Sequence, residues 1–255
     1  MTMIEVTGLH KSFGGFEVLK GINFRVERGE IMALIGRSGY GKSVLLKHVV
    51  GLLKGDQGTV LINGRDISLS RGTALENLRR KFGFLFQGGA LFDSMNVFDN
   101  IAFPLREKKR MSKEKIRERV LRELKLVDLE GVENKFPAEL SGGMKKRVAL
   151  ARCLALDPEI MLFDEPTTGL DPITAHAINQ LILDTHGRLK FTGIIITHDI
   201  AQILTMVQKV ALLNEGKIEV MGTPAEIQVS NNPLARQFLN GTNGPSHYDR
   251  ERKGQ

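Results

Sequence analysis

A glycine-rich run near the amino terminus limits what this chain can fold into more than any other feature. Residues 36–43 read Gly-Arg-Ser-Gly-Tyr-Gly-Lys-Ser, and they lie between an apolar stretch, Ile31–Ile35, and a helical pattern, Lys42–Leu53. A strand, a glycine loop and a helix in this order form a cradle in which backbone N–H groups and the helix dipole point at phosphate groups. The run therefore predicts an α/β fold that binds a phosphorylated ligand.

The side chains of this run indicate a nucleoside triphosphate bound with Mg²⁺. In such a loop, Lys42 reaches the β- and γ-phosphates and the Ser43 hydroxyl ligates the metal ion. The other expected ATP-binding residues surround these two: Gly36, Arg37, Ser38, Gly39, Tyr40, Gly41 and Val44. The alternative, a glycine turn with a solvated lysine, does not account for the strand and the helix on either side.

Two further strand ends carry polar side chains suited to hydrolysis. Ile160–Phe163 is followed by Asp164 and Glu165, and Ile194–Thr197 is followed by His198. An aspartate at the carboxyl end of a buried parallel strand can hold Mg²⁺, and a carboxylate beside it can polarise the attacking water. His198 is a candidate catalytic residue, with a structural histidine as the alternative. These residues predict a nucleotide hydrolase; a nucleotide sensor without turnover is the alternative, and Glu165 argues against it.

The rest of the chain alternates strand patterns with helical patterns. Short apolar stretches bounded by Gly, Asn and Asp are typical of strands, and apolar residues at helical spacing indicate helices. Further expected strands are Ile4–Leu9, Ile22–Val26, Val60–Ile62, Gly83–Phe86 and Val210–Leu213; expected helices are Met111–Val127 capped by Ser112, Gly142–Leu156 capped by Ser141, Pro172–Arg188, Ile200–Val207 and a short one starting at Thr223-Pro224. This alternation predicts a mostly parallel sheet covered on both faces.

The composition excludes several classes of protein. The chain has 255 residues, 42% of them hydrophobic, and no run approaches the roughly 18 apolar residues of a membrane span. Its single cysteine, Cys153, permits no intrachain disulfide and is expected to pack in the core. Much of the net charge of +7 lies in Arg106–Lys125, which reads as a solvated helix face. Aromatic residues barely interleave with that run, so we expect no nucleic-acid partner.

Several segments resemble the motifs of ABC-family ATPases. Leu140-Ser141-Gly142-Gly143-Met144 is similar to the family signature, Gln87 resembles the Q-loop glutamine, and Leu170-Asp171 resembles the D-loop. His198 resembles the switch histidine, and Phe13 lies where the family has an aromatic ring against adenine. The motifs occur in family order over residues 4 to about 222, which is nearly the whole chain.

The resemblance implies a P-loop NTPase (RecA-like) core with an ABC helical subdomain and an N-terminal antiparallel β region. The core is expected at residues 1–90 and 157–240, the helical signature subdomain at 91–156, and a polar tail at 241–255. The resemblance also implies ATP and Mg²⁺ as cofactors and an integral-membrane permease as a partner. Two copies of the chain would enclose two ATPs between them.

In such a dimer, one chain's phosphate loop and the other chain's signature hold each ATP. The resemblance therefore assigns Ser141, Gly142, Gly143 and Met144 to contact in trans, Glu165, His198 and Gln87 to catalysis, Ser43, Gln87 and Asp164 to the metal, and Asp171 to the D-loop. Met144 replaces the usual signature glutamine, Tyr40 stands where a small residue is usual, and Val44 replaces a frequent threonine. None of these departures removes a catalytic group.

The segment from Phe86 to Arg106 resembles the ATPases of Mla-type lipid transporters, especially at Gly88–Phe92 and Asn96–Asn100. Met144 and Arg236–Gly241 fit the same subgroup. This resemblance implies a phospholipid or related cargo, a permease with an MCE-domain partner, and a peripheral place on the cytoplasmic face of the inner membrane. Leu91, Phe92, Val97 and Phe98 are then expected to form a groove for a permease helix, with local core as the alternative.

Three other functions compete with lipid transport. The chain could drive an importer for another small solute, act as a soluble ABC ATPase in DNA repair or translation, or serve as a nucleotide-gated regulator. The second class typically has two cassettes in one chain or a long coiled coil. This sequence has one phosphate loop and no sustained heptad pattern, which disfavours that class.

Overall fold

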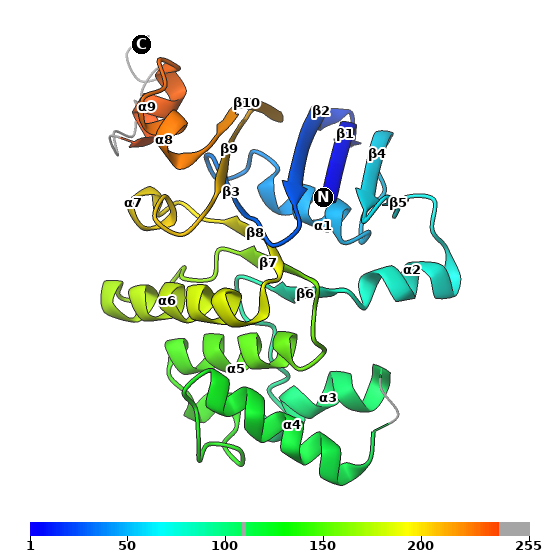
Figure 1. Cartoon of the computed structure of the whole chain (residues 1–255), viewed down its shortest axis with the longest axis vertical. Helices are drawn as coiled ribbons and strands as arrows, with labels where there is room; N and C mark the ends of the chain where they lie inside the picture. Colours follow the sequence, from blue (N-terminus) through cyan, green and yellow to red (C-terminus); the bar gives the residue numbers. More distant parts are fainter. Residues whose placement is uncertain (109–110, 240–255) are drawn as a thin grey trace.

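The amino-terminal part of the chain forms an antiparallel sheet. The computed structural model describes residues 1–108 and 111–239, and Figure 1 shows this sheet beside a second one. Its strand order is β2-β1-β4-β5, formed by β1 (Thr2–Phe13), β2 (Phe16–Glu27), β4 (Gln57–Ile62) and β5 (Arg65–Asp66). Its apolar face shares one core with helix α1 (Lys42–Val49). The expected N-terminal antiparallel β region is confirmed.

The second sheet is mostly parallel and carries the strand ends that matter for chemistry. Its order is β10-β9-β3-β8-β7-β6, formed by β3 (Ile31–Ile35), β6 (Phe82–Leu85), β7 (Ile160–Asp164), β8 (Thr192–Ile196), β9 (Lys209–Asn214) and β10 (Lys217–Gly222). Only the β9–β10 pair is antiparallel. Strands β3 and β8 are buried along their whole length, because both faces of the sheet are covered. The parallel strands all end at the same edge.

Helices cover this sheet and extend the molecule to one side. Figure 1 shows α5 (Gly142–Leu154) beneath α6 (Pro172–Leu189), with α3 (Val97–Lys108) and α4 (Lys113–Leu126) beyond α5. One hydrophobic core joins Ile101 of α3, Leu124 of α4, Leu150 of α5 and Phe163 of β7. The remaining helices are α2 (Gly72–Arg79), the 3-10 helix η1 (Pro137–Glu139), α7 (Ile200–Ile203), α8 (Pro224–Gln228) and α9 (Pro233–Leu239). The expected mostly parallel sheet, packed against helices, is thus confirmed.

The expected helix caps are present. The Ser141 hydroxyl accepts a hydrogen bond from the Met144 N–H at 3.3 Å, and the Ser112 hydroxyl accepts one from Lys115. Thr223 caps α8 in the same way. Each hydroxyl satisfies a backbone donor that would otherwise lack a partner in the first turn. Cys153 packs against the core, as expected.

Several elements differ from the sequence-based expectation, among them α1, α2, α7 and β10. Helix α1 ends at Val49 instead of Leu53, because the chain turns at Gly51, which has a φ of 72°. Helix α2 and strand β10 were not expected; α2 buries only Leu78, and β10 alternates exposed with half-buried residues. Helix α7 spans one turn instead of reaching Val207. Elements with little buried apolar surface have a weak sequence pattern.

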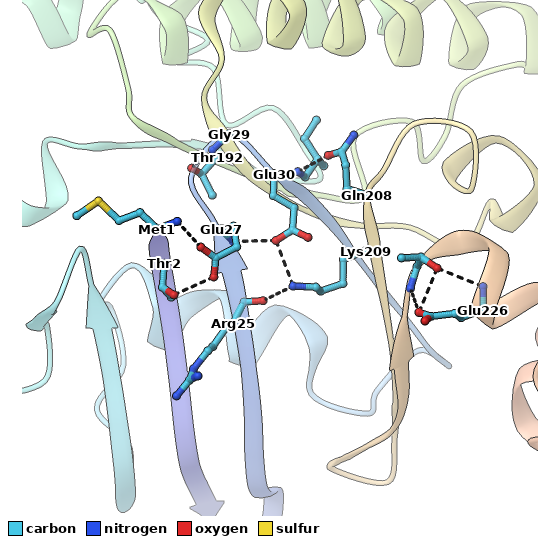
Figure 2. A network of polar contacts seen from close by, with 12 residues as sticks. Met1, Thr2, Arg25, Glu27, Gly29, Glu30, Thr192, Gln208, Lys209 and Glu226 are labelled. Atoms are coloured by element: carbon cyan, nitrogen blue, oxygen red, sulfur yellow. Dashed lines mark hydrogen bonds and ion pairs between the residues drawn. The ribbon is translucent and has the colours of Figure 1, made fainter.

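Polar contacts at the ends of β2 and β9 tie the two sheets together (Figure 2). Lys209 Nζ on β9 donates to the Arg25 carbonyl at 2.9 Å and to Glu30 at 3.2 Å. Glu30 also accepts the Glu27 N–H at 2.7 Å, and Glu27 forms an ion pair with the amino group of Met1 at 2.7 Å. The antiparallel sheet is therefore anchored to the parallel sheet by charged hydrogen bonds as well as by apolar packing.

No helix in residues 1–108 or 111–239 is both long and apolar enough to cross a membrane. The polar tail at 241–255 and the end of the Arg236–Gly241 segment lie outside the described residues. The division into core and helical subdomain at residues 91–156 stays a prediction.

Candidate ATP-hydrolysing site

The phosphate loop, residues 36–43, connects β3 to α1 and is pressed against two neighbouring strands. Gly36 has a φ of 149°, and a Cβ there would lie 2.1 Å from the Leu213 carbonyl oxygen. Gly41 has a φ of 93°, and its Cβ would lie 2.9 Å from the Val18 side chain. Both positions demand glycine. Helix α1 starts without a side-chain cap, so its first N–H groups can bind phosphate oxygens.

Lys42 is buried inside this loop. Its side chain is 7% exposed, and its ammonium donates to the carbonyls of Gly36 at 2.8 Å and Arg37 at 2.7 Å. Burial lowers the pKa of Lys42, and the carboxylates of Glu165 and Asp164 oppose that shift. The cation therefore faces the acidic end of β7, where a triphosphate has to be neutralised.

Ser43 and Asp164 form a site that fits Mg²⁺. The Ser43 hydroxyl donates to the Asp164 carboxylate at 3.0 Å. Burial raises the pKa of Asp164, although the hydrogen bond from Ser43 acts in the opposite direction. A bound cation would relieve the cost of ionising this carboxylate. Among the described residues no three His, Cys, Asp or Glu side chains gather around one point, and Mg²⁺ commonly uses one or two carboxylates together with substrate phosphates.

Glu165 lies at the centre of a second cluster, one residue beyond Asp164. Its φ is 49°, and its N–H donates to the Ile196 carbonyl at 3.0 Å, so the chain turns sharply at the end of β7. Its Oε2 atom accepts hydrogen bonds from Thr168 at 2.9 Å and from the Gln87 side-chain amide at 3.2 Å. The largely exposed His198 ring lies 4.0 Å from the same oxygen. The three candidate catalytic residues therefore meet at one carboxylate.

The structure pairs only two of the three expected metal ligands. Ser43 and Asp164 are in contact, whereas the Gln87 amide is directed to Glu165. In the described part of the chain, no hydrogen bond joins Gln87 to Ser43 or Asp164. The role of Gln87 as a metal ligand stays a prediction.

The remaining ATP-binding candidates lie around the loop and the β1–β2 turn. Phe13 ends β1 with its ring partly exposed, and the Lys11 ammonium lies 5.3 Å from the ring centroid. Tyr40 lines a cavity of about 300 Å³ together with Phe16 and Val18. Arg37, Ser38 and Gly39 are exposed on the loop, and Val44 packs against the core of the antiparallel sheet.

The signature and D-loop candidates lie at the neighbouring starts of α5 and α6. A Cβ on Gly143 would lie 2.5 Å from the Thr174 methyl carbon, and one on Gly142 would lie 3.2 Å from Leu170. Asp171 caps α6 by accepting the N–H groups of Ile173 and Thr174. In the parts of the chain described, no hydrogen bond joins Ser141–Met144 to the chain's own phosphate loop. Ser141 and Gly142 are exposed and can meet another molecule.

Sequence reasoning missed two side chains of the site. Thr168 donates to Glu165. Lys146 of α5 is 7% exposed and its ammonium donates to the backbone carbonyl of Gln87. Burial lowers the pKa of Lys146, and Glu165 opposes the shift. Lys146 shares a helical face with the buried residues Gly143 and Leu150, a spacing that could have revealed it.

A phosphate loop beside a strand that ends in Asp-Glu defines the class of P-loop nucleotide hydrolases. Comparisons with known proteins identify the family within that class. The ABC transporter family model matches residues 19–168. A Mycobacterium leprae protein described as a probable ribonucleotide transport ATP-binding protein, mkl, is 44% identical over 93% of this chain and 69% of its own length. The Haemophilus influenzae intermembrane phospholipid transport ATP-binding protein MlaF is 39% identical over 96% of this chain and 94% of its own.

The fold of a solved structure confirms the expected P-loop core with an ABC helical subdomain. The dimeric ATP-binding cassette MJ0796, in a post-hydrolysis state bound to ADP and phosphate, superposes with a TM-score of 0.80 at 33% identity, covering 87% of this chain and 99% of that one. The chain therefore belongs to the ABC transporter family. It is a transport-coupled ATPase that uses ATP and Mg²⁺, and cassettes of this family dimerise and pair with membrane permeases.

Proposed function

We propose that this ATPase powers the transport of lipid, with phospholipid as the cargo, between the membranes of a double-membraned cell. It acts through an integral-membrane permease that works with an MCE-domain lipid-binding protein. The chain lies peripherally on the cytoplasmic face of the inner membrane. Two observations support this proposal: the resemblance of Phe86–Arg106 to the ATPases of Mla-type transporters, and a match to MlaF that spans nearly all of that relative.

At the site, each residue type has a defined task. Lys42 and the α1 N–H groups hold phosphate oxygens, while Ser43 and Asp164 hold Mg²⁺, which neutralises phosphate charge when bound. Glu165 orients the attacking water and accepts its proton, with Gln87 and His198 placed at its carboxylate. The signature serine of a second copy, Ser141, completes the cage around the γ-phosphate. The roles of Ser43, Asp164, Glu165, Gln87 and His198 are supported by their mutual contacts, and that of Ser141 by its exposure and by the family resemblance.

The shape of the Phe86–Arg106 segment supports its use as a docking surface. Asn100 is fully buried; its side chain accepts the Phe92 N–H and donates to backbone carbonyls of residues 92, 95 and 96. The loop before α3 is therefore held in one conformation. Phe92 is 41% exposed, and the centroid of its ring lies 5.0 Å from that of Phe103 and 5.7 Å from the Arg152 guanidinium. A rigid loop that exposes an aromatic ring suits a permease helix.

For one of the four groove candidates named from the sequence, the alternative of local core is the correct one. Val97 is fully buried at the start of α3, where it packs in the hydrophobic core. Leu91 and Phe98 are partly buried against the same core. Phe92 is therefore the residue of the four that reaches furthest into solvent.

The test is to purify the membrane complex through a tag on this chain and to identify the permease, its accessory protein and the bound lipid. We expect an MCE-domain protein and phospholipid to co-purify. Phe92→Asp should lose the permease while the isolated chain keeps its melting temperature, because a new charge is desolvated at the contact. Leu69→Asp is the matched control, since Leu69 is 74% exposed and lies outside the segment.

The second candidate is an importer of another small solute, which the description of the mkl relative as a ribonucleotide transport protein favours. A periplasmic solute-binding protein in the purified complex, without an MCE-domain protein, would decide for that candidate.

A further inference from the structure

We propose that Lys146 is a positioning residue for ATP hydrolysis: from the signature helix it holds the Gln87 backbone and so sets where the Gln87 amide meets Glu165. The inference rests on the catalytic roles proposed above for Gln87 and Glu165.

The contacts run in one direct chain. The Lys146 ammonium donates to the Gln87 carbonyl oxygen. The side-chain amide of the same glutamine donates to Glu165 Oε2 at 3.2 Å. Thr168 holds that oxygen from the other side at 2.9 Å. Lys146 therefore holds the main chain of the same residue, Gln87, whose side chain contacts the catalytic carboxylate.

Helix α5 holds the loop after β6 at further points. The Arg152 guanidinium donates to the Gly89 carbonyl at 2.9 Å. Gly89 has a φ of 73°, and a Cβ there would lie 3.4 Å from the Ala149 side chain. Lys146, Ala149 and Arg152 follow each other at intervals of three residues, which places them on one face of the helix. Two cations and a small residue thus fasten residues 87–89 onto α5.

The same helix starts at Ser141, the residue proposed to contact the γ-phosphate in a second copy. Lys146 lies five residues further on, a rise of about 7.5 Å along the helix. Lys146 therefore links the Gln87 loop to the helix whose first turn carries the signature. A lysine suits this task because its ammonium offers three donors, and a buried charged donor binds a carbonyl more strongly than a neutral one.

The test measures kcat and KM for ATP in the full chain. Lys146→Met keeps much of the side-chain length but removes the donor, so we expect kcat to fall roughly 10- to 100-fold, a loss typical of misplacing a catalytic group. KM should change less than about twofold, because the phosphate loop is untouched. Lys146→Arg keeps a cationic donor and should retain most of the activity.

The matched control is Lys145→Met, which removes the same charge from the adjacent residue. The Lys145 side chain has no hydrogen bond or ion pair in the described part of the chain, so its kcat should stay close to wild type. Melting temperatures of all variants separate a loss of folding from a loss of rate. If Lys146→Met does not fold, Lys146→Leu, which also lacks a donor, takes its place.

A double-mutant cycle with Gln87→Ala distinguishes positioning from general stabilisation. If Lys146 acts through Gln87, adding Lys146→Met to Gln87→Ala should lower kcat no further. Two outcomes would overturn this inference while leaving the role of Gln87 intact. In the first, the two substitutions lower kcat independently, so that their effects multiply. In the second, Lys146→Met is as fast as wild type although Gln87→Ala is impaired. A Gln87→Ala enzyme at the wild-type rate would instead remove the proposed catalytic role of Gln87, and the inference with it.

Discussion

Among the described residues of the site, Glu165 contacts the largest number of other site residues. Its carboxylate is reached from Thr168, from Gln87 and from His198, which follow three different strands or turns. Its left-handed backbone, at a φ of 49°, is uncommon for a residue with a side chain. Such local strain persists because the surrounding strands fix it, and here it aims the carboxylate at its partners.

Replacing Glu165 by Gln should lower ATP hydrolysis by roughly 10²–10⁴-fold, because the variant keeps the shape but loses the proton acceptor. Nucleotide binding should survive, and the dimer should accumulate with ATP trapped in it. Steady-state hydrolysis and gel filtration with ATP measure both effects. Glu219→Gln, at an exposed position of β10, is the control for the change in charge. Full activity of Glu165→Gln would contradict its assignment as the base.

Replacing Lys42 by Ala should lower hydrolysis by about 10²–10³-fold, as removal of one preorganised donor does. Nucleotide affinity should fall as well, because the ammonium contacts phosphate in the ground state. An ATPase assay and nucleotide titration check the two effects. Lys54→Ala removes the same charge at an exposed position and should have little effect. Wild-type turnover without Lys42 would refute the site.

At the scale of elements, the edge where the parallel strands end explains why much of the site could be predicted from the sequence. Parallel strands β3, β7 and β8 end at the same edge of the sheet. Once the strands are recognised in the sequence, the residues that follow them are therefore expected to lie close together. The contact between Ser43 and Asp164 was therefore predictable from two strand patterns, although the two residues lie 121 positions apart. Lys146 was missed because a Lys-Lys-Arg run is typical of a solvated surface, and only its spacing from Gly143 and Leu150 indicates that it lies on the buried face of α5. Helix α2 and strand β10 were missed for the related reason that they bury little apolar surface.

The packing of α5 on α6 depends on a missing side chain at Gly143. Gly143→Ala places a methyl group 2.5 Å from the Thr174 methyl carbon, and such overpacking lowers the free energy of unfolding by about 1–3 kcal/mol. Thr174→Ser in the same chain removes the opposing methyl group and should restore most of the loss. Urea unfolding measures both variants.

Gly187→Ala provides the control for this substitution. It lies within α6, and a Cβ there meets no atom within 4 Å, so the change should raise stability by about 0.5–1 kcal/mol through helix propensity. Equal losses from Gly143→Ala and Gly187→Ala would show that the contact with Thr174 is not the cause.

At the scale of the whole molecule, the exposed start of α5 requires a second copy if it is to contact ATP. Chains carrying Ser141→Arg should therefore inactivate wild-type chains with which they dimerise, because each site would contain the phosphate loop of one copy and the signature of the other. Hydrolysis measured against the fraction of variant in the mixture should fall more steeply than a straight line. Adding Lys54→Ala chains should leave the rate per chain unchanged. A strictly linear loss with Ser141→Arg would argue for sites contained in single chains.

The ammonium of Lys42 already has two backbone acceptors within its own loop, at 2.8 and 2.7 Å. An ammonium carries three N–H donors, so two of them fix the position of Lys42 within its own loop and the third can reach a phosphate oxygen. The lysine is therefore ordered before it meets the nucleotide, and binding costs little of its side-chain entropy.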